Sequence, residues 1–253
     1  MPNDRPPPLS GPNRELTFGS LIGRGHAGSP MERLQTKEQQ VAEFLREGIL
    51  GGLFARGQKL KQAEIAERLA ISITPVREAL KLLEAEGYVQ VSAHRGAVVA
   101  PFQIERVEEL FELRLMMETR LTQVAAQRLS DADLAELREI DRLMNQAVEL
   151  RELEHSRRAY NFRFHFRLYR CADLPQMLHF VRVVWAKYPF DILGEWPNRA
   201  GQVAREHESI LDALAASDAD GAMQAMRHHI ETGQNLFRAN YDRVAARQAS
   251  PAR

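Results

Sequence analysis

Three histidines in the second half of the chain have the residue type and the placement expected of metal ligands. Helical periodicity puts His165 on an apolar stripe with Phe162, and it puts His207 and His229 on the apolar faces of two later helices. Asn161 lies one turn before His165, so both side chains project inward. Neutral imidazoles and oxygen atoms suit zinc and other first-row divalent ions. The candidate metal ligands are therefore Asn161, His165, His207 and His229; the alternative is that each is a hydrogen-bonded core residue.

A second stretch with functional residue types is ISITPVREALKLLEAEGYV, residues 71–89. Its positions 76, 79, 80 and 83 are apolar and spaced i, i+3, i+4 and i+7, which predicts a helix with one buried stripe. Thr74, Arg77 and Lys81 point away from that stripe. Ser72 or Thr74 can cap the helix, and Pro75 is tolerated in the first turn because its missing N–H would have no intrahelical acceptor.

The polar start of this helix suits a nucleic acid. Free N–H groups at the positive end of a helix dipole, together with hydroxyls and Arg77, can contact phosphates and guanine edges in a major groove. The alternative is an ordinary solvated helix start, which shows the same residue types.

The elements around this helix complete a recognisable plan. Helical periodicity runs from near Leu34 to Gly51 and Gly52, and a second helix is predicted over QAEIAERLA. After Gly87 the pattern changes to alternation, which predicts a two-stranded hairpin with His94 and Arg95 at its tip and Gly96 in its turn. Three helices and a hairpin are the plan of a winged helix-turn-helix, over residues 32–102.

The rest of the chain is predicted to be almost entirely helical. Residues 103–247 show no strand pattern, and their breaks separate six helices of about 15 to 28 residues, which indicates an antiparallel bundle. Residues 1–31, rich in Pro, Gly and Ser, and residues 248–253 are expected to be disordered. The predicted fold is thus mainly α, with an N-terminal winged helix-turn-helix followed by an all-α bundle.

Composition limits the classes of protein that remain. With 253 residues and a formal net charge of zero, the chain is long enough for two domains and has no overall field that attracts nucleic acid or anionic membranes. Any DNA-binding surface must be local. The single cysteine, Cys171, excludes an intramolecular disulfide, and we find neither a signal peptide nor an apolar membrane span. We expect a cytoplasmic protein with no membrane partner.

The stretch SITPVREALKLLEAEGYV and the later HRGAVVA resemble the signature of the GntR family of bacterial transcription regulators. The resemblance covers roughly Leu34 to Phe102. It implies operator contacts through six residues of the recognition helix and the wing: Ser72, Thr74, Arg77, His94, Arg95 and Gly96. Two positions depart from the family pattern, because Ile73 stands where an arginine is usual and Ala70 where a glycine is usual.

The helical half is similar to the effector domain of the FadR-like subgroup, which dimerises and often binds a divalent metal. The subgroup's ligand pattern corresponds to Asn161, His165, His207 and His229, with Asn161 replacing an aspartate. The resemblance implies zinc, with nickel and manganese as alternatives, and a small organic acid as effector. Arg114 is a candidate second anchor for that acid, or else the partner of Glu118 one turn later.

Two classes of function follow. The favoured one is a ligand-responsive regulator that binds an inverted-repeat operator as a homodimer; a variant of it lacks the metal and takes an acyl-type ligand. A metal-dependent hydrolase is the rival, since three histidines and an open position can activate water. An enzyme has no use for a DNA-reading head, so we do not expect one.

Overall fold

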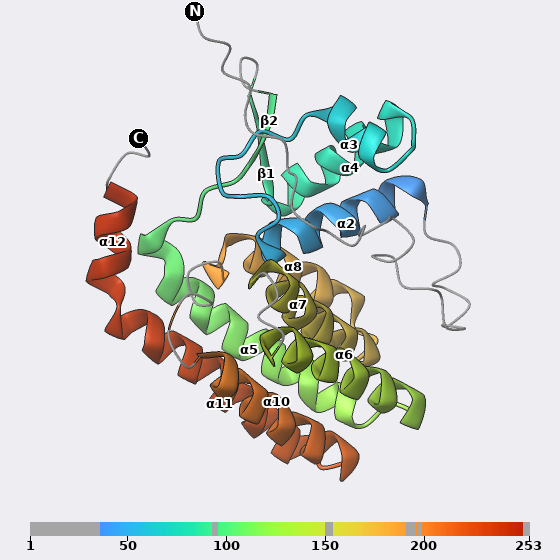
Figure 1. The fold of residues 1–253 in the computed structure, drawn as a ribbon. Helices are drawn as coiled ribbons and strands as arrows, with labels where there is room; N and C mark the ends of the chain where they lie inside the picture. Colours follow the sequence, from blue (N-terminus) through green and yellow to red (C-terminus); the bar gives the residue numbers. More distant parts are fainter. Residues whose placement is uncertain (1–35, 93–95, 150–153, 191–195, 197–198, 250–253) are drawn as a thin grey trace, which may run out of the picture.

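The computed structural model describes residues 36–92, 96–149, 154–190, 196 and 199–249. Its N-terminal domain has the predicted order of three helices and a hairpin (Figure 1). The elements are α2 (Lys37–Gly51), α3 (Gln62–Arg68), α4 (Ile73–Glu86), β1 (Val89–Ser92) and β2 (Gly96–Val99). The predicted tail, residues 1–31, lies outside the described residues.

The helix ends follow from local chemistry. The side chain of Gln39 accepts a hydrogen bond from the N–H of Thr36 at the start of α2. Gly52 and Gly87 end α2 and α4 in the left-handed conformation, each with φ of 86°. Ser72 is the N-cap of α4, but its side chain makes no capping hydrogen bond. The four apolar positions predicted to be buried in α4 are all buried, as Val76, Ala79, Leu80 and Leu83.

The hairpin is joined by a segment that the sequence pattern did not indicate. β1 and β2 pair antiparallel, with Val89 opposite Val99. Residues 57–60 run along the other edge of β2: Leu60 N–H donates to the carbonyl of Ala97, and Val99 N–H donates to that of Gln58. This third pairing covers the edge of β2 that β1 leaves open.

The second domain is a bundle of helices beneath the first (Figure 1). Seven α-helices are described where six were predicted, and the last reaches Ala249, past the predicted boundary at 247. No strand occurs among the described residues after β2. The elements are a short 3₁₀ helix (Ile104–Arg106), α5 (Val107–Ala126), α6 (Asp131–Glu149), α7 (Glu154–Cys171), α8 (Pro175–Lys187), α10 (Arg199–Ala215), α11 (Ala219–Ala239) and α12 (Tyr241–Ala249).

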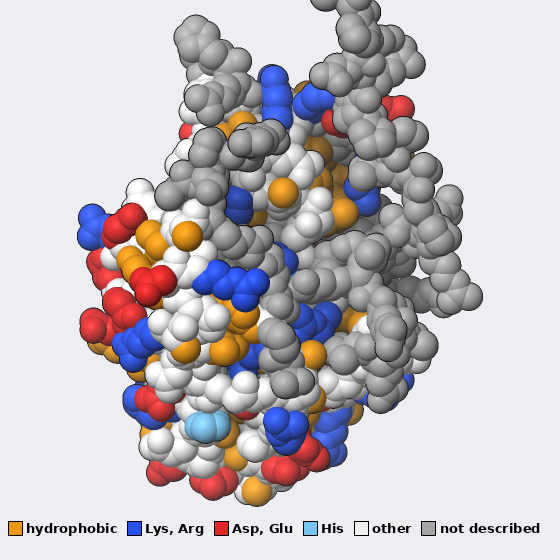
Figure 2. Space-filling model, turned by 60° about the vertical axis from the view of Figure 1, so that its left-hand side comes forward, with side chains coloured by type: hydrophobic (Ala, Val, Ile, Leu, Met, Phe, Trp, Pro, Cys, Tyr) orange, Lys and Arg blue, Asp and Glu red, His pale blue; other side chains and the backbone are white. Residues whose placement is uncertain are grey.

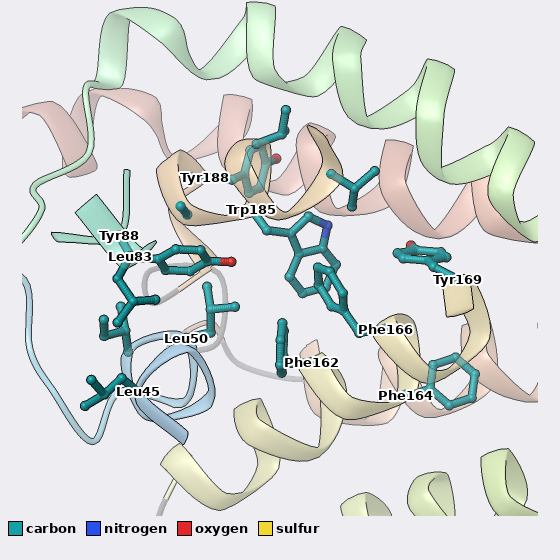
Figure 3. Close-up of a cluster of buried hydrophobic side chains, with 14 of the residues drawn as sticks. Leu45, Leu50, Leu83, Tyr88, Phe162, Phe164, Phe166, Tyr169, Trp185 and Tyr188 are labelled. Carbon is teal, nitrogen blue, oxygen red and sulfur yellow. The ribbon is translucent and has the colours of Figure 1, made fainter. Parts of the chain in front are cut away.

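One hydrophobic core continues from the first domain into the second. Figure 3 shows Leu50 of α2 and Tyr88 near Phe162 of α7 and Trp185 of α8. Helix α2 packs along α7, and α5 packs against both α7 and α11. Trp185 of α8 is fully buried and belongs to this core. The bundle therefore supports the first domain directly.

The surface is mixed in charge. On the face in Figure 2, basic and acidic side chains alternate over short distances, in line with the zero net charge. Among the described helices, none has the length and apolar character needed to cross a bilayer.

Candidate metal centre and nucleic-acid interface

The three predicted histidines converge in the middle of the bundle. His165 comes from α7, His207 from α10 and His229 from α11, and their ligand atoms all lie within 4.8 Å of one another. The ring centroids are separated by 5.3 Å (His165 and His207), 5.0 Å (His165 and His229) and 5.1 Å (His207 and His229). His165 and His207 are fully buried and His229 is 6% exposed. Adjacent His228 is exposed, as the periodicity indicated.

Each of these rings is hydrogen-bonded on its outer side through Nδ1. His207 Nδ1 lies 3.0 Å from Oδ1 of Asp141, and His229 Nδ1 lies 2.7 Å from Oε2 of Glu206. Both carboxylates are acceptors, so these Nδ1 atoms carry the proton. Burial raises the pKa of Glu206, but Arg199, which is 2.9 Å away, opposes this shift and favours the charged form.

His165 is held in the same way by a phenol. Its Nδ1 lies 2.9 Å from the hydroxyl of Tyr169, and that hydroxyl donates its own proton to Glu118. The hydroxyl can therefore only accept from His165, which places the proton of His165 on Nδ1 as well.

The inner nitrogens of this arrangement fit a divalent metal. Nε2 of His165 and Nε2 of His207 are buried and have no hydrogen-bond partner among the described residues. Buried polar atoms without partners are costly, and rings whose outer nitrogen is protonated direct a free lone pair inward. Burial, reinforced by the neighbouring histidines, lowers the pKa of His165 and of His229 well below its usual value. Both imidazoles are thus neutral near pH 7, as metal ligation requires.

The fourth candidate, Asn161, lines a cavity next to the histidines. It is half-buried on α7, one turn before His165, and shares with His229 a cavity of about 70 Å³. Four arginines also line this cavity: Arg114, Arg157, Arg158 and Arg199. None of the described lining residues is acidic.

Arg114 has the intrahelical partner considered as the alternative to an effector contact. Its Nε donates to Glu118 at 2.6 Å, and both side chains are buried. Its guanidinium lies 4.5 Å from the ring centre of Tyr188 and 4.7 Å from that of Phe190. Arg114 therefore lines the cavity as a neutralised ion pair.

The predicted DNA-contacting residues of α4 lie together on its exposed side. Ser72, Thr74 and Arg77 are all exposed at or near the start of the helix. Ile73, at the position where the family pattern has arginine, is 49% exposed. Gly96 begins β2 with φ of 70°, whereas His94 and Arg95 fall outside the described residues.

Three residues of the site were missed by sequence reasoning: Asp141, Glu206 and Tyr169. Glu206 had a detectable signal, because it precedes His207, although it serves the histidine of another helix. Tyr169 lies one turn after His165. Asp141 had no signal in the sequence, since 66 residues separate it from His207.

Comparison with known proteins identifies both domains. The model of the family described as "Bacterial regulatory proteins, gntR family" matches residues 37–99, and that of the FCD domain matches residues 109–232. The chain belongs to the GntR family. Regulators of this family are not enzymes, so the hydrolase alternative is wrong.

Individual relatives of this GntR-family regulator are also described as transcription regulators. The "Nta operon transcriptional regulator" of Aminobacter aminovorans is 28% identical over 179 residues, covering 70% of this chain and 83% of that protein. The regulator McbR of Escherichia coli K12 is 24% identical over 210 residues, covering 81% of this chain and 94% of McbR. The solved E. coli McbR/YncC structure has the same fold, with a TM-score of 0.69 at 24% identity over 82% of this chain and all of that one.

Proposed function

We propose that this GntR-family regulator binds an inverted-repeat operator as a homodimer and responds to a small carboxylate bound beside a divalent metal in its helical domain. In this proposal residues 32–102 read DNA and residues 103–247 bind the effector and the second subunit. The observation that carries the metal part is the set of three buried histidines whose outer nitrogens are hydrogen-bonded and two of whose inner nitrogens have no partner among the described residues.

The ligand set favours zinc over harder ions. Three imidazole nitrogens suit zinc, with nickel as an alternative and manganese, a harder ion, as a weaker one, and the amide oxygen of Asn161 is a candidate fourth ligand. A bound metal would supply coordination positions for an anion.

The cavity beside the histidines favours a compact anion. Four arginines line it and none of the described lining residues is acidic, so the lining carries positive charge even though Arg114 and Arg199 are already paired with Glu118 and Glu206. A volume of about 70 Å³ has room for a few water-sized groups. We therefore propose a small carboxylate, held by the arginines and by the metal.

Exposed apolar side chains on α5 and α8 support the homodimer. Leu113 and Met116 of α5 are 38% and 71% exposed, and Phe180 of α8 is 57% exposed. Leu113 and Phe180 line one groove, and α5 packs against α8. A patch of this kind is costly on a monomer and is typical of an interface.

The DNA-binding part is tested by operator titrations of wild type and Arg77→Ala. Arg77 is exposed on α4 and is placed to contact a base, so its loss should cost about 1 to 3 kcal/mol and relax specificity at one position of each half-site. Arg142→Ala removes an exposed charge from α6 and serves as control. Equal operator affinity for wild type and Arg77→Ala at matched salt would refute this role.

The metal part is tested by elemental analysis of purified wild type, His229→Ala and His228→Ala. The two histidines are adjacent, but only His229 is buried in the cluster. Wild type and His228→Ala should carry about one equivalent of metal, and chelator should lower their melting temperature. Equal, negligible metal in all three proteins would support the metal-free variant with an acyl-type ligand.

A further inference from the structure

The cavity beside the histidines is shared by the two domains. Leu50, in the last turn of α2 of the DNA-binding domain, lines it together with Asn161 and Arg158 of α7 and His229 of α11. Figure 3 shows Leu50 lying between Tyr88 and Phe162, where α2 meets the bundle. An occupant of this cavity would therefore touch the DNA-binding domain as well as the effector domain.

Arg158 joins the cavity to the end of α2. Its Nε donates to the carbonyl of Leu50 at 3.2 Å. Its guanidinium also lies directly against Gly52, since a Cβ added there would be 2.9 Å from Nη2 of Arg158. Gly52 has φ of 86°, so glycine is favoured here both by conformation and by space.

This contact stabilises a helix end that has no basic residue of its own. The last turn of α2 contains none, and the unpaired carbonyls at a helix C-terminus favour a positive charge. Arg158, from the other domain, supplies that charge.

Three further arginines make polar contacts between the domains, among the described residues, and none of the three lines the cavity. Arg163 binds Glu47 of α2 through two hydrogen bonds, of 3.0 and 2.7 Å, and Arg170 binds Glu43 at 2.6 Å. Arg56, from the DNA-binding domain, donates to the carbonyls of Ala186 and Tyr188 at the end of α8 in the bundle. Of these arginines, only Arg158 both contacts α2 and lines the cavity.

A movement of α2 would be transmitted to α4, the recognition helix. Arg46 of α2 donates from Nε and Nη2 to the two carboxylate oxygens of Glu86, at 2.6 and 2.8 Å, in the last turn of α4. Both residues are buried. A buried bidentate ion pair of this kind couples the positions of the two helices.

We propose that Arg158 transmits occupancy of the cavity to the DNA-binding domain. An anionic ligand in the cavity accepts hydrogen bonds from the Arg158 guanidinium in competition with the Leu50 carbonyl, and a carboxylate is the stronger acceptor. The end of α2 thereby loses its positive partner, and the position of α4 changes with it. This inference rests on the proposed anionic effector.

The coupling can be followed by hydrogen exchange of the zinc-loaded protein with malonate, succinate and citrate, each at millimolar concentration. The anion that raises the melting temperature most should speed exchange at the end of α2, residues 48–54, and should change operator affinity about fivefold or more. No melting shift with any of the three anions would refute the proposed effector class and this inference together. A melting shift with unchanged exchange at residues 48–54 would refute only the coupling.

Two matched pairs of variants separate coupling from binding. Arg158→Gln should lose the operator response, whereas Arg163→Gln, which breaks a contact outside the cavity, should keep it.

Gly52→Ala places a methyl group against Arg158 without altering a cavity-lining residue. This variant should bind the anion at least as tightly as wild type, while its operator affinity no longer responds to the anion. Gly57→Ala controls for backbone strain, since Gly57 has φ of 78° and no atom within 4 Å of the added Cβ. A normal operator response in Gly52→Ala or Arg158→Gln would overturn the proposal.

Discussion

The hydroxyl of Tyr169 lies 2.9 Å from Nδ1 of His165 and donates its own proton to Glu118. Glu118 is in turn paired with Arg114 and accepts from Trp185 Nε1 at 3.0 Å. A buried chain of hydrogen bonds therefore runs from the cavity-lining Arg114 to a proposed metal ligand. Each step fixes the donor and acceptor roles of the next.

Tyr169→Phe should weaken metal binding without unfolding the protein. The variant removes the oxygen that accepts from His165 Nδ1–H while keeping the aromatic ring in the core. Loss of such an outer partner typically costs 10- to 100-fold in metal affinity, and we expect a decrease of about that size. Competition titrations of zinc against a chelator measure it. Tyr241→Phe, at an exposed tyrosine, should bind zinc like wild type; unchanged affinity in Tyr169→Phe would show that His165 is not a ligand.

Asn161→Asp should strengthen metal binding. The amide of Asn161 is a neutral oxygen donor one turn before His165, and a carboxylate at that position adds a negative ligand. Metal that binds only the folded state then stabilises it further through mass action. We expect higher zinc affinity and a larger melting-temperature difference between zinc-loaded and chelated protein. If the two proteins gave the same difference, Asn161 would lie outside the coordination sphere.

Glu43→Gln should remove an acid-dependent part of the stability. Burial alone would raise the pKa of Glu43, but Arg170 and Arg46 outweigh it and lower the pKa from 4.5 to about 2. A carboxyl whose pKa is depressed on folding stabilises the protein above pH 4.5, and this contribution is lost as the pH falls toward 2. At about 1.4 kcal/mol for each pH unit, the lowering of this pKa corresponds to roughly 3 kcal/mol.

Urea unfolding at several pH values checks this expectation. Glu43→Gln should be less stable than wild type near neutral pH, and the difference should shrink as the pH falls below about 4.5. Glu112→Gln, at an exposed position on α5, provides the control and should follow wild type. A difference that is constant with pH would indicate lost packing and no ion-pair contribution.

Ala70→Gly should stabilise the DNA-binding domain. Ala70 lies in the turn between α3 and α4 with φ of 53°, a conformation that costs an L-residue about 1 to 2 kcal/mol. Part of the gain is offset by the greater freedom of glycine in the unfolded chain, so we expect a net increase of about 0.5 to 1 kcal/mol. Ala85→Gly, at an exposed position within α4, should instead lower stability by a similar amount. Thermal unfolding of both variants distinguishes these opposite signs.

Side-chain direction within a helix could be predicted from the sequence. A repeat of 3.6 residues is local, so the inward placement of His165, His207 and His229 and the outward placement of His228 follow from neighbouring residues alone. The buried stripe of α4 and the glycine that ends α2 are local in the same sense. The motif of residues 72–89 is specific enough to indicate the family by itself.

Contacts between distant segments were decided only by the tertiary structure. Asp141 reaches His207 across 66 residues, residues 57–60 join β2, and Leu50 of the DNA-binding domain enters the wall of the effector cavity. Each contact depends on which faces of the helices and strands meet and on how far one element is shifted along the other. Packing of the whole core sets both. Periodicity specifies which way a side chain points from its own helix, but the partner that it meets is chosen by the helices that pack around it.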